Sequence, residues 1–347
     1  MKAPSLDEVK AKAEAAVHIP DVKQPSVQII AAGGCGTNLL KDFLALNTKF
    51  DQNIRYSIID TSQSNMAGVP KHVVVNAVGD LGSGRDRAAN ASIISRYLDI
   101  NKKLVEDATD ITIILFSMAG GSGSVIAPLL THRLMRHSNR AVILVGVADL
   151  SSMRDCTNTI RTLESISLMC SENKYYVPLM LFSNDGVGRR KVNPTVVSRL
   201  VSLVDMLTSK AITEIDYTDK MNYLRPTAVG CPHGCYLISV IPSDPEGKDV
   251  ESLPGEPEIK LDVNDMVHVS MVVNDSGLTP DILTTVTYNG ISDTKKFFST
   301  IGKPIPQELI YRLNEKAEEY KRAPMARETL QKSFEKEGTV DSTGLVL

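Results

Sequence analysis

Short runs of apolar and β-branched residues alternate along the chain with stretches in which apolar residues recur at helical spacing. Alternation of this kind is typical of βαβ units, in which each strand is followed by a helix that covers the sheet. We therefore predict an α/β fold built on a doubly wound parallel sheet. The predicted strands are Val27–Ala31, Ile54–Ile59, His72–Val75, Ile111–Phe116, Ala141–Val147 and Val177–Phe182.

The second half of the chain has a different pattern. Apolar residues at helical spacing from Asn193 to Glu214 predict a long central helix. Beyond Thr227, strand-like runs predict a smaller α+β domain with a mixed sheet. These runs are Tyr236–Ile241, Val267–Val273 and Ile282–Tyr288.

The two ends of the chain are predicted to be helical. Ser5 and Glu8 have capping-box spacing at the start of a helix that runs to about His18. Two charged helices and a short tail are expected near the other end, at Pro306–Arg322 and Met325–Lys336. The predicted units are a helical extension with a linker (1–26), a domain that holds the parallel sheet (27–192), the central helix with the loop that follows it (193–226), a second α+β domain (227–305) and C-terminal helices with a tail (306–347).

Composition narrows the class of protein. The chain has 347 residues, 42% of them hydrophobic and 23% charged, and a formal net charge of −3. A soluble globular protein fits these values, and the absence of a basic excess argues against direct binding of nucleic acid. No apolar run approaches the roughly 18 residues of a membrane span, and no secretory leader is recognisable, so a cytoplasmic location is expected.

Cysteine spacing offers no metal site. The segment from Cys231 to Cys235 has the spacing of half a zinc site, but a second pair of ligands is not apparent nearby. We expect a turn flanked by buried thiols, and no bound structural metal.

Three loops rich in glycine follow predicted strands. They are Gly33–Asn38, Gly79–Asp86 and Ser117–Ser124. Backbone N–H groups at such turns, together with the positive end of a following helix, favour a bound phosphate, and three loops suit a triphosphate. Leu39 stands where a dinucleotide fingerprint has its last glycine, which weakens that interpretation, and no lysine completes a P-loop.

In this order the loops resemble those of the tubulin/FtsZ superfamily of polymerising GTPases, over roughly Val27 to Ile310. The resemblance implies binding of GTP or GDP with Mg²⁺. It implies a first phosphate loop of Gly33, Gly34, Cys35, Gly36 and Asn38, a γ-phosphate sensor of Ser83 and Gly84, and a glycine-rich signature of Ala119, Gly120, Gly121, Ser122, Gly123 and Ser124.

The same resemblance assigns the sugar and the base. Arg154 matches a ribose-contacting arginine, and the usual acidic residue of that loop would be Leu150 unless Asp149 takes its place. Asn184 matches the guanine-contacting asparagine, and Asn193 is a second candidate base contact.

Asp216 and Asp219 resemble the pair of catalytic carboxylates that completes the GTPase site of a neighbouring subunit. If the nucleotide lies at one end of the molecule and this pair at the other, hydrolysis requires head-to-tail contact, which propagates as a filament of identical subunits. Catalysis and assembly are then coupled.

The helical segment from Pro306 resembles that of phage and plasmid tubulin-like proteins, in which a C-terminal helix and tail help to join subunits; the alternative is an amphipathic helix packed on its own domain. The resemblance implies a role in positioning or segregating plasmid or phage DNA, through a cargo adaptor, in a host bacterial cytoplasm. Two alternatives stay open. Leu150, Glu214 and Val125 depart from the family pattern, which leaves room for a nucleotide-binding scaffold without hydrolysis. An NAD-dependent oxidoreductase would explain the first glycine loop but would leave Asp216 and Asp219 without roles.

Overall fold

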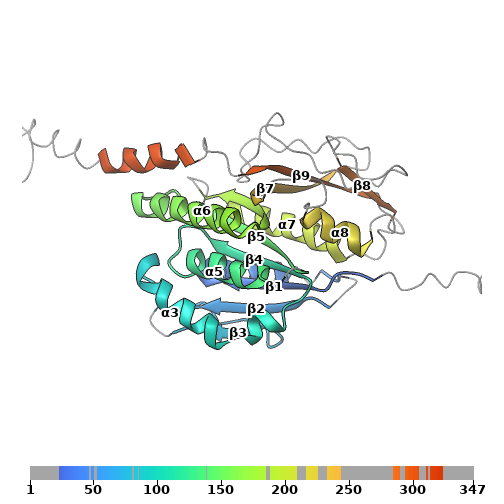
Figure 1. Ribbon diagram of the computed structural model, residues 1–347, viewed down its shortest axis with the longest axis horizontal. Coiled ribbons are helices and arrows are strands. Elements are labelled where there is room, and N and C mark those ends of the chain that lie inside the picture. The colour runs from blue at the N-terminus through green and yellow to red at the C-terminus, as the bar shows by residue number, and fades with distance from the viewer. Residues whose placement is uncertain are drawn as a thin grey trace, which may run out of the picture.

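The computed structural model describes residues 23–46, 48–50, 53–79, 82–84, 86–137, 139–184, 188–208, 216–225, 233–243, 284–289, 294–304, 310–311 and 313–322. Within these ranges the chain forms a sheet with helices on both faces (Figure 1). The strands are β1 (Val27–Ala32), β2 (Arg55–Asp60), β3 (Val74–Ala77), β4 (Ile111–Ser117), β5 (Ala141–Ala148), β6 (Tyr176–Ser183), β7 (Gly234–Ser243), β8 (Thr284–Asn289) and β9 (Thr294–Pro304).

The sheet has nine strands in the order β3-β2-β1-β4-β5-β6-β7-β9-β8. Strands from β3 to β7 are parallel, and β9 pairs antiparallel with both β7 and β8. Ala32, at the end of β1, lies opposite Ile59 of β2 and Phe116 of β4. The carboxyl ends of the central strands therefore meet at one edge, where open α/β sheets bind their ligands.

Helices bury both faces of the sheet. They are α2 (Gly33–Ala45), α3 (Arg87–Ile100), α4 (Lys103–Glu106), α5 (Gly123–Met135), α6 (Met153–Asn173), α7 (Arg189–Thr208) and α8 (Tyr217–Leu224). In β1, Ile29 belongs to the core under α2 and α7, whereas Ile30 belongs to the core under α3, α5 and α6. Burial on both faces explains why these strands are continuous apolar runs.

The predicted α/β fold class is confirmed, and the six predicted strands of the first domain correspond to β1–β6. Helix α7 begins at Arg189, earlier than the predicted Asn193, and β9 was not predicted. β7 pairs with β6, so the strands beyond the central helix continue the same sheet. The predicted segments 5–18, 267–273 and 325–336 lie outside the described residues.

Residues 313–322 form a helix whose apolar side packs on the core next to α6. Leu313 and Ala317, one turn apart, are buried there, and the Tyr320 hydroxyl donates to the carbonyl of Leu150 at 3.0 Å. Among the helices of the described residues, none is both long and apolar enough to cross a lipid bilayer.

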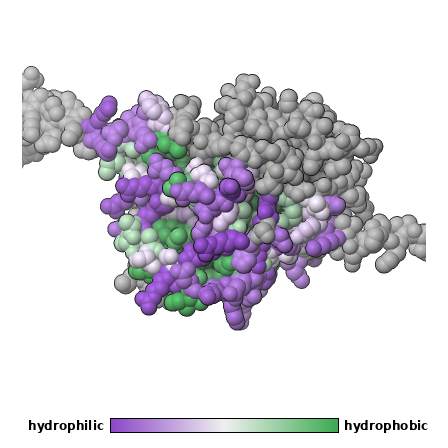
Figure 2. All heavy atoms as spheres, in the orientation of Figure 1, coloured by the Kyte–Doolittle hydropathy of each residue, from purple (hydrophilic) through white to green (hydrophobic). Residues whose placement is uncertain are grey.

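An apolar groove of about 520 Å³ runs between α3, α5 and α6, lined by residues that include Pro128, Leu129 and Met169. Figure 2 shows hydrophobic residues scattered among hydrophilic ones on the face of the molecule that it presents. The groove is separate from the cleft at the carboxyl edge of the sheet.

Candidate functional site

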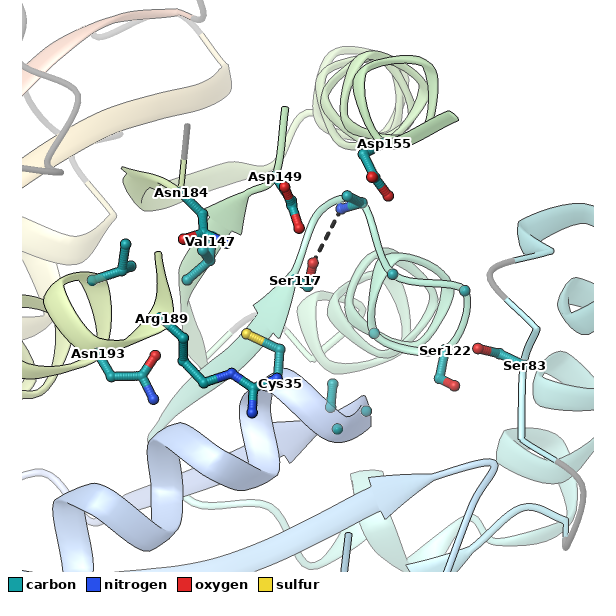
Figure 3. Close-up of a pocket in the computed structure, with 18 residues that line it drawn as sticks. Cys35, Ser83, Ser117, Ser122, Val147, Asp149, Asp155, Asn184, Arg189 and Asn193 are labelled. Carbon is teal, nitrogen blue, oxygen red and sulfur yellow. Dashed lines mark hydrogen bonds between the residues drawn. The ribbon is translucent and has the colours of Figure 1, made fainter. Parts of the chain in front are cut away.

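A polar cleft of about 230 Å³ lies at the carboxyl ends of β1, β4, β5 and β6. Its walls come from the loops after these strands and from the first turns of α2, α5, α6 and α7 (Figure 3). The lining residues are Ala32, Gly33, Gly34, Cys35, Ser83, Ser117, Ala119, Gly120, Gly121, Ser122, Gly123, Val147, Asp149, Asp155, Asn184, Arg189, Val192 and Asn193.

Two helices present uncapped N-termini to this cleft. The N-cap residues of α2 and α5, Ala32 and Ser122, make no side-chain capping hydrogen bond, and neither helix has an acidic residue in its first turn. The neighbouring α3 and α6 are capped by Asp86 and Ser152. Free N–H groups and two helix dipoles therefore converge on the cleft, as an anion-binding site requires.

Hydrogen bonds hold the carbonyls of the loop after β4. Side chains on its outer side bind its carbonyls: Thr162 donates to Met118 at 2.9 Å, Asn158 donates to Ala119 at 3.0 Å, and the Ser124 hydroxyl donates to Gly120. In a trans peptide the next N–H points opposite to the carbonyl. The N–H groups of Gly120 and Gly121 therefore point away from Asn158 and Ser124, and both glycines line the cleft, where such N–H groups can bind an anion.

Glycines allow the backbone of the loop after β1 to contact the backbone of the loop after β4. A Cβ on Gly33, which has φ +71°, would lie 2.8 Å from the nitrogen of Gly123, and one on Gly123 would lie 2.6 Å from the carbonyl oxygen of Ala32. A Cβ on Gly36 would lie 2.1 Å from the carbonyl oxygen of Leu115. Only glycine permits this backbone contact, which brings the N-termini of α2 and α5 together.

Carboxylates lie on the α6 side of the cleft. Asp149 follows β5 and accepts hydrogen bonds from the backbone N–H of Ser151, at 3.1 Å, and from its hydroxyl. Asp155 is buried and accepts from the Ser152 hydroxyl at 2.6 Å. Carboxylates beside a phosphate site are suited to the hydroxyl groups of a sugar.

The α7 side of the cleft is lined by amides, a guanidinium and a thiol. Among the described residues, Asn184 Oδ1 is buried without a hydrogen-bond partner, so an acceptor is left open toward a ligand. Arg189 and Asn193 are one turn apart on α7 and both reach the cleft. Burial raises the pKa of the Cys35 thiol to about 11, against the opposing effect of Arg189, so this group is neutral at physiological pH.

Most of the predicted nucleotide-binding residues come together in this cleft. Four of the predicted residues are absent from the cleft lining, and a fifth, Ser124, turns its hydroxyl away from the cleft. Gly36 is packed against β4, Asn38 lies within α2, and Gly84 and Arg154 are absent from the cleft lining. Ser124 is buried with its hydroxyl turned to Gly120.

The acidic pair is found at the other edge of the sheet. Asp216 immediately precedes α8, and its carbonyl accepts from the N–H of Lys220 at 3.1 Å. The adjacent Tyr217 donates to Asp110, the residue before β4, at 3.1 Å. On balance the hydrogen bonds from Ser26 and Tyr217 lower the Asp110 pKa, although burial alone would raise it. Asp216 thus lies at the amino ends of the strands, and Asp219 is within α8.

Sequence reasoning missed two charged residues of the cleft. Arg189 precedes Asn193 by four residues, a spacing that places both on one helix face. Asp155 follows Ser152 by three residues, the spacing of an N-cap and its partner. Either spacing is a signal that the printed sequence contains.

Known proteins resemble this chain in sequence. The profile of the family described as "Tubulin/FtsZ family, GTPase domain" matches residues 26–187. A phage tubulin-like protein of Pseudomonas phage 201phi2-1 is 26% identical over 218 residues, which cover 58% of this chain and 64% of the relative. The chain therefore spans a little under two thirds of that relative's length.

Solved structures show the same fold. A protofilament structure of TubZ from bacteriophage PhiKZ matches with a TM-score of 0.67 and 21% identity, over 92% of this chain and 99% of that one. CetZ2 from Haloferax volcanii, solved as a GTPγS-bound protofilament, matches with a TM-score of 0.63 and 14% identity, over 85% and 99% of the two chains.

Proposed function

We propose that the protein, whose residues 26–187 match the tubulin/FtsZ family of GTPase domains, binds GTP, assembles head to tail into filaments and hydrolyses GTP where two subunits meet. The observation that carries the proposal is the position of two features on opposite edges of one sheet. The anion-binding cleft lies at the carboxyl ends of the strands, and Asp216 lies at their amino ends.

Helix α7 sets the separation between these features. It starts beside the cleft at Arg189 and ends at Thr208, and 20 helical residues span roughly 30 Å. Asp216 therefore cannot reach a nucleotide in the cleft of its own subunit. A second subunit stacked head to tail brings its Asp216 edge to that cleft, and repetition of the same contact makes a filament.

The cleft is matched to the three parts of a nucleotide. The N-termini of α2 and α5 and the N–H groups of Gly120 and Gly121 bind the phosphates, with Ser83 beside them. Asp149 binds the ribose hydroxyls, in place of the acidic group that Leu150 does not supply. Asn184 and Asn193 bind the guanine edge, because an asparagine oxygen accepts from the base N–H groups.

Magnesium is proposed to enter with the phosphates. Among the described residues, no group of three or more histidine, cysteine or acidic side chains could hold a metal ion. Mg²⁺ commonly takes phosphate oxygens and water with few protein ligands. The hydroxyls of Ser83 and Ser122 line the phosphate end and are oxygen donors suited to such an ion, which would neutralise phosphate charge there.

Asp216 and Asp219 of the neighbouring subunit are proposed to polarise the attacking water. A carboxylate can accept a proton from water as it attacks the terminal phosphorus. The proposed biological role is the positioning or segregation of phage or plasmid DNA in a bacterial cytoplasm, through an adaptor. Similarity to a phage tubulin-like protein supports the phage setting of this proposed role.

Sedimentation with parallel phosphate release tests the proposal. The full-length protein is incubated over a range of concentrations with GTP, GDP, ATP or no nucleotide. GTP-selective pelleting, with turnover that rises above a critical concentration, is expected. Pelleting with GTP but no turnover would instead identify a non-hydrolysing scaffold, and a folded protein that shows neither behaviour would overturn the proposal.

A further inference from the structure

Asp42 of α2 and Asn193 of α7 form a hydrogen bond at the edge of the cleft. Asn193 Nδ2 donates to Asp42 Oδ2 at 2.7 Å, and this contact joins two helices that are 151 residues apart in the sequence. Asn193 lines the cleft, whereas Asp42 is outside its lining. In Figure 3 the Asn193 nitrogen points toward α2 and its oxygen lies on the side of Asn184.

The carboxylate determines which way the Asn193 amide faces. An amide can rotate to exchange its oxygen and nitrogen, and the choice is decided by its hydrogen-bond partners. An ionised carboxylate can only accept, so Asp42 attracts the NH₂ group and repels the oxygen. The Asn193 oxygen is consequently presented as an acceptor to whatever occupies the cleft.

An acceptor at this position distinguishes the two purines. Guanine carries N–H donors at N1 and at its 2-amino group, whereas adenine has a lone pair at N1 and no 2-amino group. With the oxygen of Asn193 facing the base, guanine gains a hydrogen bond and adenine meets an unfavourable pairing of two acceptors. The buried open acceptor on Asn184 lies in the same cleft.

We propose that Asp42 is a specificity-determining positioning residue, which makes the cleft select guanine over adenine nucleotides by fixing the orientation of Asn193. This inference rests on the proposed function, because it concerns recognition of the nucleotide in the same cleft. Asp42 acts through Asn193 and need not touch the nucleotide.

Equilibrium binding of GTP and ATP to the full-length protein and to Asp42→Ala tests the inference. Loss of the carboxylate frees the Asn193 amide to rotate and donate to adenine. We expect GTP affinity to fall about fivefold to tenfold, the loss of roughly one hydrogen bond, and ATP affinity to stay the same or rise. If Asp42 has a merely structural role, its loss would lower the affinity for GTP and for ATP by the same factor, and that result would overturn the inference.

Two further variants sharpen the test. In Asp42→Asn/Asn193→Asp the side chain at position 193 accepts in either rotation, and the amide at position 42 can donate to it, so preference for GTP is expected to return. Glu106→Ala, which removes an exposed carboxylate outside the cleft, is the matched control and should bind like wild type.

The outcomes separate this inference from the proposed function. If the wild-type protein binds no GTP, the proposed function fails first. If the wild type selects GTP and Asp42→Ala keeps the same ratio of GTP to ATP affinity, or if the double variant does not regain it, the proposed role of Asp42 fails while the proposed function stands.

Discussion

The hydroxyl of Tyr320, on the helix of residues 313–322, donates to the carbonyl of Leu150 at 3.0 Å. Leu150 follows Asp149, which lines the cleft, and its carbonyl also lies 3.8 Å from the thiol of Cys156. One hydrogen bond thus ties the C-terminal helix to the loop proposed to bind ribose. The position of that helix and the shape of the cleft are physically linked.

Tyr320→Phe removes this hydrogen bond and leaves the aromatic ring in place. The free energy of unfolding is expected to fall by about 1 kcal/mol, the usual net value of one hydrogen bond. Urea denaturation measures this change, and nucleotide affinity should also weaken because the ribose loop loses an anchor. Tyr97→Phe is the control, because the Tyr97 hydroxyl, on α3, makes no hydrogen bond within the described residues. Equal stability and affinity in wild type and Tyr320→Phe would contradict the linkage.

Gly36→Ala is expected to destabilise the protein strongly. The new methyl group would meet the Leu115 carbonyl oxygen at 2.1 Å, and neither backbone can move without disturbing β4. Overpacking of this kind typically costs about 1–3 kcal/mol and occasionally more.

Gly120→Ala is the matched control for this substitution. Its nearest neighbour would be the Ser117 side chain at 3.5 Å, an ordinary van der Waals distance. Thermal melting of the two variants should show a large fall in Tm for Gly36→Ala and a small one for Gly120→Ala. A similar Tm for both would show that close backbone packing at Gly36 is unimportant.

Alkylation of Cys35 should be slow and strongly dependent on pH. With a pKa of about 11, only about 0.1% of the thiol is ionised at pH 8, and the thiolate is the reactive form. The rate with iodoacetamide should rise about tenfold per pH unit up to that pKa. Because Cys35 lines the cleft, GTP should protect it. Peptide mass mapping reads out the site, and rapid labelling at pH 7 or labelling unaffected by GTP would count against the assignment.

The sequence was sufficient to predict the site residues that directly follow a predicted strand. Gly120, Gly121 and Asn184 follow apolar strands directly, and the carboxyl ends of parallel strands meet at one edge, so their convergence could be predicted. β9 escaped prediction because its sequence, with three lysines and two glycine or proline positions, lacks a continuous apolar run.

Residues whose position depends on helix rotation could not be predicted. Successive residues of a helix point about 100° apart. At the start of α6, packing of Cys156 and Ile160 on the core turns Asp155 inward and leaves Arg154 exposed. The family resemblance assigned Arg154 to the ribose, but the direction of each side chain is set by tertiary packing, and Arg154 is absent from the cleft lining. Arg189 was missed for the same reason, because how α7 packs on the sheet decides which side chains of its first turn reach the cleft.

Asp216→Ala should uncouple assembly from hydrolysis. Asp216 is remote from the cleft of its own chain, so nucleotide binding and GTP-dependent pelleting should persist. GTP turnover should fall about 100-fold or more, because a general base contributes up to about 10⁴-fold to the rate. Asp107→Ala, which removes another exposed carboxylate, should turn over GTP at the wild-type rate. A full rate in Asp216→Ala would exclude its proposed role.

The most direct test of the central claim mixes two inactive variants. Asp216→Ala keeps the cleft, and Gly120→Glu keeps Asp216 but places a carboxylate where the phosphates are proposed to bind. If one site is built from two subunits, about a quarter of the contacts in an equal mixture join an intact cleft to an intact Asp216. The account predicts that GTP turnover reappears on mixing and rises with protein concentration. No recovery, from variants that co-assemble, would contradict a site shared between subunits.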